Sequence, residues 1–320
     1  MHPVLSRIAD RQEGVITRQQ ALTVMSAGDV GAQLGRLWQV MLPGVYATFT
    51  GPLDDRHRTR AALLHAGPES MINDLTALAA HNVPYLPSDR FRRVLVPDRV
   101  QVGSRDFVVV RRSKRLPEPV ALGGLPAVPL VRALCEFGAR HDDERASLAV
   151  FAAVVQRRRL ALTVIDREIE AGPSRGRPKL VRISAALASG IRSAPEDDFR
   201  RLVLTSNVVP EPNWNWLIEL PSGRRISPDA LLCDAALVHE TNGREAHAAD
   251  KAGEDAFEDM QRRADALVTA GFTVLQNTPR RIASEGTEVL AEFETCYLRN
   301  KGRGLPPGVV IVRAGPPVTA

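Results

Sequence analysis

Three carboxylates in the C-terminal third of the sequence could meet at one end of a small sheet. Glu196 lies near the start of an amphipathic, helix-like segment. Asp229 follows a proline in one strand-like segment, and Glu240 ends the next, more apolar one. Mg²⁺ prefers such hard oxygen ligands and keeps several waters when it is bound. Because a bound divalent cation can activate water and stabilise charge on a phosphodiester, the carboxylates predict metal-dependent phosphodiester hydrolysis.

The elements that would position these carboxylates follow the order helix, three strands, helix, strand and helix. Gly271 suits the position just after the end of the second helix, where a left-handed residue is common. The expected bounds are a helix from residue 193, strands over 214–220, 225–232 and 235–240, a helix over 254–270, a strand over 272–276 and a helix to about 298.

Each carboxylate also has a purely structural interpretation. Glu196 comes three residues after Ser193 and would complete a capping box. Glu240 stands next to a hairpin-like segment, where surface carboxylates are common. Asp229 favours the functional interpretation, because aspartate is otherwise unfavourable inside a strand. The presence of His247 alone does not distinguish the structural interpretation from the functional one.

The first 50 residues have the pattern of a winged helix-turn-helix. A helix near residues 4–9 is followed by one capped by Thr17 and a third capped by Asp29 that runs to Leu37. Residues 38–49 then read as a hairpin around Pro-Gly. In such a fold the third helix enters the major groove of DNA.

Gln33 and Arg36 are the main polar residues that the third helix offers to DNA. Two such side chains are few for reading base edges. A module that only packs against a partner or against the rest of the chain is therefore the alternative.

Composition places the chain among ordinary globular proteins. It has 320 residues, of which 44% are hydrophobic and 25% charged, with a net charge of +5. The sequence predicts no membrane span and no signal peptide. Three widely spaced cysteines fit the reducing cytoplasm and argue against a zinc site. The basic charge, nearly all arginine, is compatible with nucleic acid but does not establish it.

We expect four segments: residues 1–50, a mixed α/β middle domain over 51–190, the carboxylate-bearing domain over 191–300, and a mobile tail over 301–320. In the middle domain we expect a buried helix over 73–81, strands over 94–97 and 107–110, and a helix over 130–137. His81 is expected to be packed rather than catalytic. The basic cluster of the middle domain is either a phosphate grip or a solvated loop; it comprises Arg111, Arg112, Lys114 and Arg115.

Two stretches of the chain resemble known families. Residues 36–46, Arg-Leu-Trp-Gln-Val-Met-Leu-Pro-Gly-Val-Tyr, closely resemble the start of the wing in the N-terminal domain of AbiEi-type antitoxins. Residues 193–196 with Arg200, residues 238–247 and residues 259–275 resemble the group of PD-(D/E)XK nucleases that is similar to very-short-patch-repair endonucleases. The order and spacing of these short motifs carry the likeness, which extends over residues 3–300.

The nuclease resemblance implies a site with Mg²⁺ or Mn²⁺. Asp229 and Glu240 would be metal ligands together with the backbone carbonyl of Thr241, and Glu196 would hold a water. His247 would transfer a proton or contact phosphate. Arg262 or Arg263, on the following helix, would neutralise phosphate charge.

One position departs from the nuclease pattern. Asn242 stands where the broad family has lysine and the nearer group has aspartate, and asparagine supplies neither charge nor a base. Lys251 lies nearby but does not match the motif. Catalysis would then depend on His247, or the domain has kept the fold and lost the chemistry.

Two functions follow. In the first, the helix-turn-helix delivers a Mg²⁺-dependent endonuclease to DNA. In the second, the chain is a non-catalytic antitoxin or transcriptional regulator, with a cognate toxin as a possible partner. Carboxylates gathered around a metal position favour the nuclease, whereas carboxylates held apart or neutralised by arginine favour the regulator. The Gly-Pro-Ser-Arg-Gly string at residues 172–176 is a chance match to serine hydrolases, and no nucleotide-binding fingerprint is present.

Overall fold

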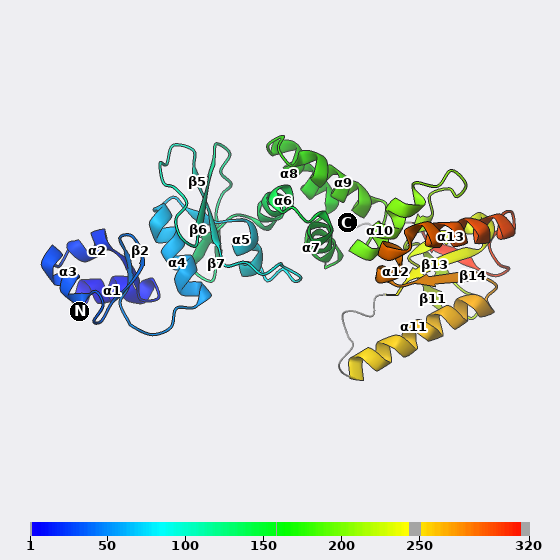
Figure 1. Cartoon of the computed structure of the whole chain (residues 1–320), viewed down its shortest axis with the longest axis horizontal. Helices are drawn as coiled ribbons and strands as arrows, with labels where there is room; N and C mark the ends of the chain where they lie inside the picture. Colours follow the sequence, from blue (N-terminus) through cyan, green and yellow to red (C-terminus); the bar gives the residue numbers. More distant parts are fainter. Residues whose placement is uncertain (1, 158, 243–250, 315–320) are drawn as a thin grey trace. The chain divides into compact units, whose positions relative to one another are not determined.

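The computed structural model describes residues 2–157, 159–242 and 251–314 (Figure 1). Within these residues it is a mixed α/β protein with thirteen α-helices and four sheets, as the sequence predicts. The chain divides into two compact units. The first comprises Met1–Asp142 with Arg167–Arg177, and the second comprises Asp143–Asp166 with Pro178–Ala320.

The first unit begins with the expected three helices and hairpin, together with a short strand that the sequence pattern did not indicate. The strands form an antiparallel sheet in the order β1-β3-β2, and Leu5 of α1 packs in one buried cluster with Ile16 of β1 and Trp38. The elements are α1 Pro3–Arg11, β1 Val15–Thr17, α2 Arg18–Leu22, α3 Ala27–Gln33, β2 Gln39–Leu42 and β3 Val45–Ala47.

The third helix differs from the prediction at both ends. Ser26, not Asp29, is its N-cap, and Asp29 closes the capping box from the third helical position. The helix ends at Gln33, since the next residue, Leu34, has extended dihedral angles. Arg36 therefore lies beyond the helix.

The rest of the first unit places helices against a five-stranded mixed sheet in the order β6-β5-β4-β8-β7. The predicted strands and helices of this region are present. The elements are α4 Asp55–Ala66, β4 Met71–Ile72, α5 Asp74–Ala80, β5 Arg92–Pro97, β6 Val108–Ser113, β7 Val120–Leu122, β8 Leu125–Ala127 and α6 Leu130–Arg140.

The second unit starts with helices that the sequence pattern had assigned to the middle domain. Glu144 on α7 forms ion pairs with Arg182 on α9 and with Arg201 on α10, at 2.7 and 2.8 Å. These pairs tie α7 and α9 to the carboxylate-bearing part of the chain. The helices are α7 Glu144–Gln156, α9 Arg177–Ala188 and α10 Ala194–Val203, with α8 Leu162–Ala171 running from one unit to the other.

A four-stranded sheet in the order β14-β13-β12-β9 forms the centre of the second unit. β13 pairs antiparallel with β12 and parallel with β14. α11 and α13 lie on opposite sides of this sheet (Figure 1), with Leu267 of α11 packed among Leu231 and Val238. The elements are β9 Asn213–Trp214, β12 Ala230–Leu232, β13 Leu237–Thr241, α11 Lys251–Thr269, β14 Thr273–Asn277, α12 Pro279–Ser284 and α13 Gly286–Asn300.

The first two predicted strands of this domain are each divided between two sheets. Asn215, with a left-handed φ of 56°, ends β9 and separates it from β10. The Pro228-Asp229 step likewise separates β11 from β12. The second, three-stranded sheet has the order β11-β10-β15; its strands are β10 Leu217–Glu219, β11 Arg225–Ile226 and β15 Val310–Arg313.

The expected mobile tail also contains ordered structure. β15 pairs antiparallel with β10, because its run of β-branched residues favours an extended, paired backbone. Residues 315–320 lie outside the described part of the chain. No α-helix in the described ranges combines the length and apolar composition needed to cross a bilayer.

Candidate metal centre

Asp229 and Glu240 lie next to each other at one end of the β12–β13 pair, Asp229 just before β12 and Glu240 near the end of β13. In the β12–β13 pair, Ala230 is opposite His239 and Leu231 is opposite Val238. Extending this register by one residue beyond the start of β12 puts Asp229 level with Glu240. Directly opposed side chains of an antiparallel pair lie close together on one face, where like charges destabilise the sheet. Asp229 Oδ2 also accepts the backbone N–H of Thr241 at 2.8 Å. The sheet thus brings together two of the three predicted carboxylates.

Arg263 is the arginine that reaches this pair. Its Nη2 atom donates to Glu240 Oε1 at 3.2 Å and to the carbonyl oxygen of Ser227 at 3.0 Å. Arg262, the other candidate, forms an ion pair with Glu258 one turn away on the surface of α11. The structure therefore places Arg263, and not Arg262, beside the predicted metal ligands.

Glu196 is held at the N-terminus of α10 by three hydrogen bonds. Its carboxylate accepts the Arg192 N–H at 2.9 Å, the Ser193 hydroxyl at 2.8 Å and the Asn215 amide at 2.7 Å. Ser193 Oγ in turn accepts the N–H of Glu196. Ser193 is thus the N-cap of α10, but the capping box is incomplete, because the Glu196 carboxylate accepts the N–H of Arg192 and the hydroxyl of Ser193 instead of the backbone N–H of Ser193.

The three carboxylates disfavour one another's ionisation. Burial raises the pKa of Asp229 well above its usual range, and repulsion from Glu196 and Glu240 raises it further. Burial also raises the pKa of Glu196 and of Glu240, although Arg263 partly offsets the effect on Glu240. A bound cation would stabilise a cluster of this kind. Its positive charge would offset the cost of burying the carboxylates and would reduce their mutual repulsion.

The donor set suits Mg²⁺ or Mn²⁺ bound through few protein ligands. Among the described residues, no group of three His, Cys, Asp or Glu side chains is placed to hold a metal ion. Mg²⁺, however, is usually held by one or two carboxylates, with waters and substrate phosphates completing its shell. Asp229 and Glu240 meet that requirement. Thr241 Oγ1 is buried without a partner among the described residues, but the alternation of β13 places this side chain on the face opposite Glu240.

The remaining predicted residues of the site are only partly visible. His247 falls in residues 243–250, outside the described part of the chain, and Lys251 begins α11. Asn242 is half-buried, and its backbone N–H donates to the carbonyl of Asn277 at 2.9 Å. It continues the β13–β14 pairing.

Two buried polar residues that the sequence pattern did not single out, His239 and Asn215, lie next to the candidate site. His239 is fully buried and stacks on Phe199 with 3.5 Å between ring centroids, while its Nε2 atom contacts the Asn277 amide. Burial lowers the pKa of His239 to about 3, which keeps the ring neutral. Asn215 ends β9 and binds Glu196. The alternation of β13 was the available signal for His239, since it places position 239 on the face opposite Glu240.

The N-terminal module offers a sparse surface for DNA. The exposed residues of α3 are small or acidic: Ala27, Gly28, Asp29, Gly31 and Ala32. Gln33 is half-buried and Arg36 is exposed. Small side chains permit close approach to a groove but supply no base-specific donors.

The candidate residues of the middle region have mainly structural contacts. His81 Nε2 lies 3.1 Å from the carbonyl oxygen of Val128, in line with the predicted packing role. In the basic cluster, Arg115 forms an ion pair with Glu168, and Arg112 donates to Gln101 at 3.2 Å. These contacts reduce the charge that the cluster offers to phosphate.

Among solved structures, the chain is similar to the crystal structure of the RV2827C protein from Mycobacterium tuberculosis. The likeness covers 57% of this chain and 75% of that chain, with 15% sequence identity and a TM-score of 0.40. No family model matches the chain, and no curated protein matches it significantly. A likeness this weak assigns neither a family nor an activity.

Proposed function

We propose that the chain is a DNA-binding protein whose second unit hydrolyses phosphodiester bonds as a divalent-cation-dependent endonuclease. The observation that carries this proposal is the closeness of two buried carboxylates: Asp229, just before β12, accepts the Thr241 N–H at the end of β13, and Glu240 of β13 raises the pKa of Asp229. Such a pair is unfavourable without a cation; burial first, and then repulsion from Glu196 and Glu240, raise the pKa of Asp229. Buried like charges of this kind concentrate at functional sites.

In the proposed site, Asp229 and Glu240 bind Mg²⁺ or Mn²⁺. The bound cation supplies electrophilic stabilisation of the phosphate and lowers the pKa of water. Arg263 leaves Glu240 and pairs with a phosphate oxygen, for which its planar fork is suited. Glu196 accepts three hydrogen bonds and so holds the start of α10 and Asn215, at the end of β9, in fixed positions beside Asp229 and Glu240.

The N-terminal module would bring this site to DNA through phosphate contacts more than through base contacts. Arg36 supplies exposed positive charge next to α3, and Gln33 supplies one amide. Phosphate contacts position a protein on a duplex without specifying sequence. The proposed partner is therefore duplex DNA, bound with modest sequence preference by this module.

The direct test is nicking of supercoiled plasmid in Mg²⁺ or Mn²⁺ by the full chain. We expect wild type to nick, and Asp229→Ala and Glu240→Ala to lose at least a hundredfold in rate, as loss of a major electrostatic contribution does. Asp259→Ala is the matched control, because Asp259 is an exposed carboxylate of α11 that pairs with Arg224. Circular dichroism establishes that each variant is folded. Equal nicking by all four proteins would exclude the site.

A DNA-binding regulator with a degenerate nuclease fold is the second candidate. The Arg263–Glu240 ion pair favours it, since an internal cation already neutralises one proposed ligand. The presence of Asn242 at the usual lysine or aspartate position favours it as well. Folded wild type that binds DNA, fails to nick with either cation and is not stabilised by Mn²⁺ would establish the regulator, with a toxin as its candidate partner.

A further inference from the structure

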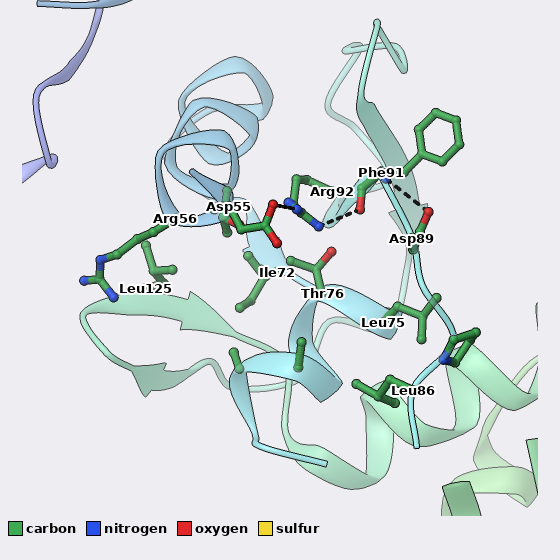
Figure 2. Close-up of a pocket in the computed structure, with 14 residues that line it drawn as sticks. Asp55, Arg56, Ile72, Leu75, Thr76, Leu86, Asp89, Phe91, Arg92 and Leu125 are labelled. Carbon is green, nitrogen blue, oxygen red and sulfur yellow. Dashed lines mark hydrogen bonds and ion pairs between the residues drawn. The ribbon is translucent and has the colours of Figure 1, made fainter. Parts of the chain in front are cut away.

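The first unit contains a pocket of about 310 Å³ between α4, α5 and the start of β5. Its wall is mainly apolar, with Ile72, Leu75, Leu86 and Leu125 among the lining residues. Figure 2 shows Thr76 beside these residues and the Asp55–Arg92 pair next to them. Pockets of this size and composition, with a few polar groups, are typical of small-molecule sites.

Arg92 is the polar residue of this pocket whose hydrogen-bonding capacity is least used. Its side chain is 10% exposed, and its Nε atom is buried without a hydrogen-bond partner among the described residues. Nη1 donates to the Phe91 carbonyl at 3.3 Å, and Nη2 pairs with Asp55. A buried guanidinium with an unpaired N–H retains unused capacity to bind an anion, because a carboxylate engages two of its N–H groups at once.

Asp55 is a replaceable partner for Arg92. Its side chain is 81% exposed, so it returns to water at little cost when it leaves the guanidinium. The other acidic residue of the wall, Asp89, is already neutralised by Arg93 and accepts the N–H of Phe91 at 3.0 Å. Once Asp55 swings out, the polar end of the pocket carries a net positive charge.

We propose that this pocket binds a small monocarboxylic acid with an apolar body, whose carboxylate replaces Asp55 on Arg92, and that α4 transmits its occupancy to the N-terminal module. The apolar body fills the space beside Ile72, Leu75 and Leu86. This site is independent of the proposed nuclease centre, which lies in the other unit.

The link to the N-terminal module runs through α4. Asp55, Arg56 and Thr59 of this helix line the pocket. Arg56 also donates to Glu13 Oε1 at 2.8 Å, and Arg60 donates to Glu13 Oε2 at 2.7 Å. Burial opposes ionisation of Glu13, yet the hydrogen bonds from both arginines lower its pKa below the usual value. Because the same helix also packs against β1, β2 and β3, a change at its first turn reaches that sheet directly.

The test uses the full chain with hexanoate and phenylacetate as probes and with their amides as neutral controls. Calorimetry and ligand-observed saturation-transfer NMR measure binding. We expect both acids to bind and the amides not to bind. Asp55→Ala should tighten acid binding about tenfold, since it removes the internal competitor, a charged hydrogen bond. Asp98→Ala, an exposed carboxylate of the same unit outside the pocket, should leave affinity unchanged, and Arg92→Gln should abolish binding.

Acids and amides that bind equally, or an Asp55→Ala variant that binds no better than Asp98→Ala, would overturn the site. The Asp55 comparison holds even if Arg92→Gln fails to fold. Amide hydrogen exchange tests the transmission, with slower exchange expected in both α4 and β1 when acid is bound. Slowing confined to α4 and β5 would overturn the link to the N-terminal module.

Discussion

Arg263 on α11 donates to Glu240 on β13 at 3.2 Å and thereby supplies the counter-ion of a proposed metal ligand. The Arg263 side chain is 36% exposed, whereas that of Glu240 is 13% exposed. The arginine can therefore move into solvent more easily than the carboxylate. This asymmetry makes the ion pair a switchable element: a cation or a phosphate can compete for one partner or the other.

Arg263→Gln should tighten Mn²⁺ binding about tenfold in the absence of DNA. Removing the arginine frees Glu240 from a charge-assisted hydrogen bond and removes a positive charge that repels the cation. Calorimetric titration with MnCl₂ measures the affinity. Arg262→Gln, which breaks only the surface pair with Glu258, is the control and should bind as wild type does. Identical affinities for both variants would show that Arg263 does not compete with the cation.

Asp229→Asn should stabilise the metal-free protein at neutral pH by about 0.5–2 kcal/mol. The amide still accepts the Thr241 N–H but carries no charge for Glu196 and Glu240 to repel. Urea unfolding followed by fluorescence measures the change. Asp259→Asn, an exposed carboxylate, should remain within about 0.5 kcal/mol of wild type.

The stability gained by Asp229→Asn should depend on pH. Because the folded-state pKa of Asp229 is raised above the ordinary value of 3.8, folding disfavours its ionised form. The cost is present above the folded pKa and vanishes once the group is protonated in both states. The advantage of Asp229→Asn should therefore be largest near pH 7 and disappear as pH falls below about 4. An advantage that grows on acidification would contradict the repulsion argument.

Glu196→Ala should lower the free energy of unfolding by about 1–3 kcal/mol, because three donors lose their acceptor in a buried position. Glu196→Gln should stay closer to wild type, since its carbonyl oxygen can accept from Arg192 and Asn215 while its NH₂ group faces the Ser193 hydroxyl. Urea midpoints compare the two. Equal losses would indicate that the charge, not the hydrogen bonding, matters.

His239 should make the second unit sensitive to acid. Its pKa is about 3 in the folded state, against 6.5 for the ordinary group. Between these values the unfolded chain binds a proton that the folded chain does not, so stability falls with falling pH by up to about 1.4 kcal/mol per pH unit. His239→Gln should reduce this slope. Trp214, 6.2 Å from the Phe199 ring on which His239 stacks, reports unfolding of this unit. His65→Gln is the control and should keep the wild-type slope.

Arg36→Ala should weaken DNA binding similarly across unrelated sequences. In the proposed function, this exposed arginine outside α3 would contact phosphate rather than base edges, so its loss should reduce the slope of log K against log salt by about 1. Fluorescence anisotropy on two unrelated duplexes at several salt concentrations measures this. A loss confined to one sequence would indicate base readout instead.

Several features were predictable because they depend on local pattern. Alternating apolar residues and the turn signals indicated the order of helices and strands around the carboxylates. The pairing of the segment that follows Asp229 with the strand that carries Glu240 followed from the same pattern, since consecutive strands joined by a short connection usually pair; that Asp229 itself lies between β11 and β12 did not. The N-cap role of Ser193 was also predictable, because Glu196 follows it by three residues, but the bond from the Glu196 carboxylate to Arg192 was not.

The tertiary structure decided which charges meet and which strands belong together. Arg262 and Arg263 are equivalent in sequence, but the rotation of α11 against the sheet brings only Arg263 to Glu240. The division of the predicted strands at Asn215, the burial of His239 and the pairing of β15 with β10 depend on contacts between distant segments. Side-chain periodicity fixes the face on which a residue lies, whereas its neighbours across that face are set by packing, which no local pattern contains.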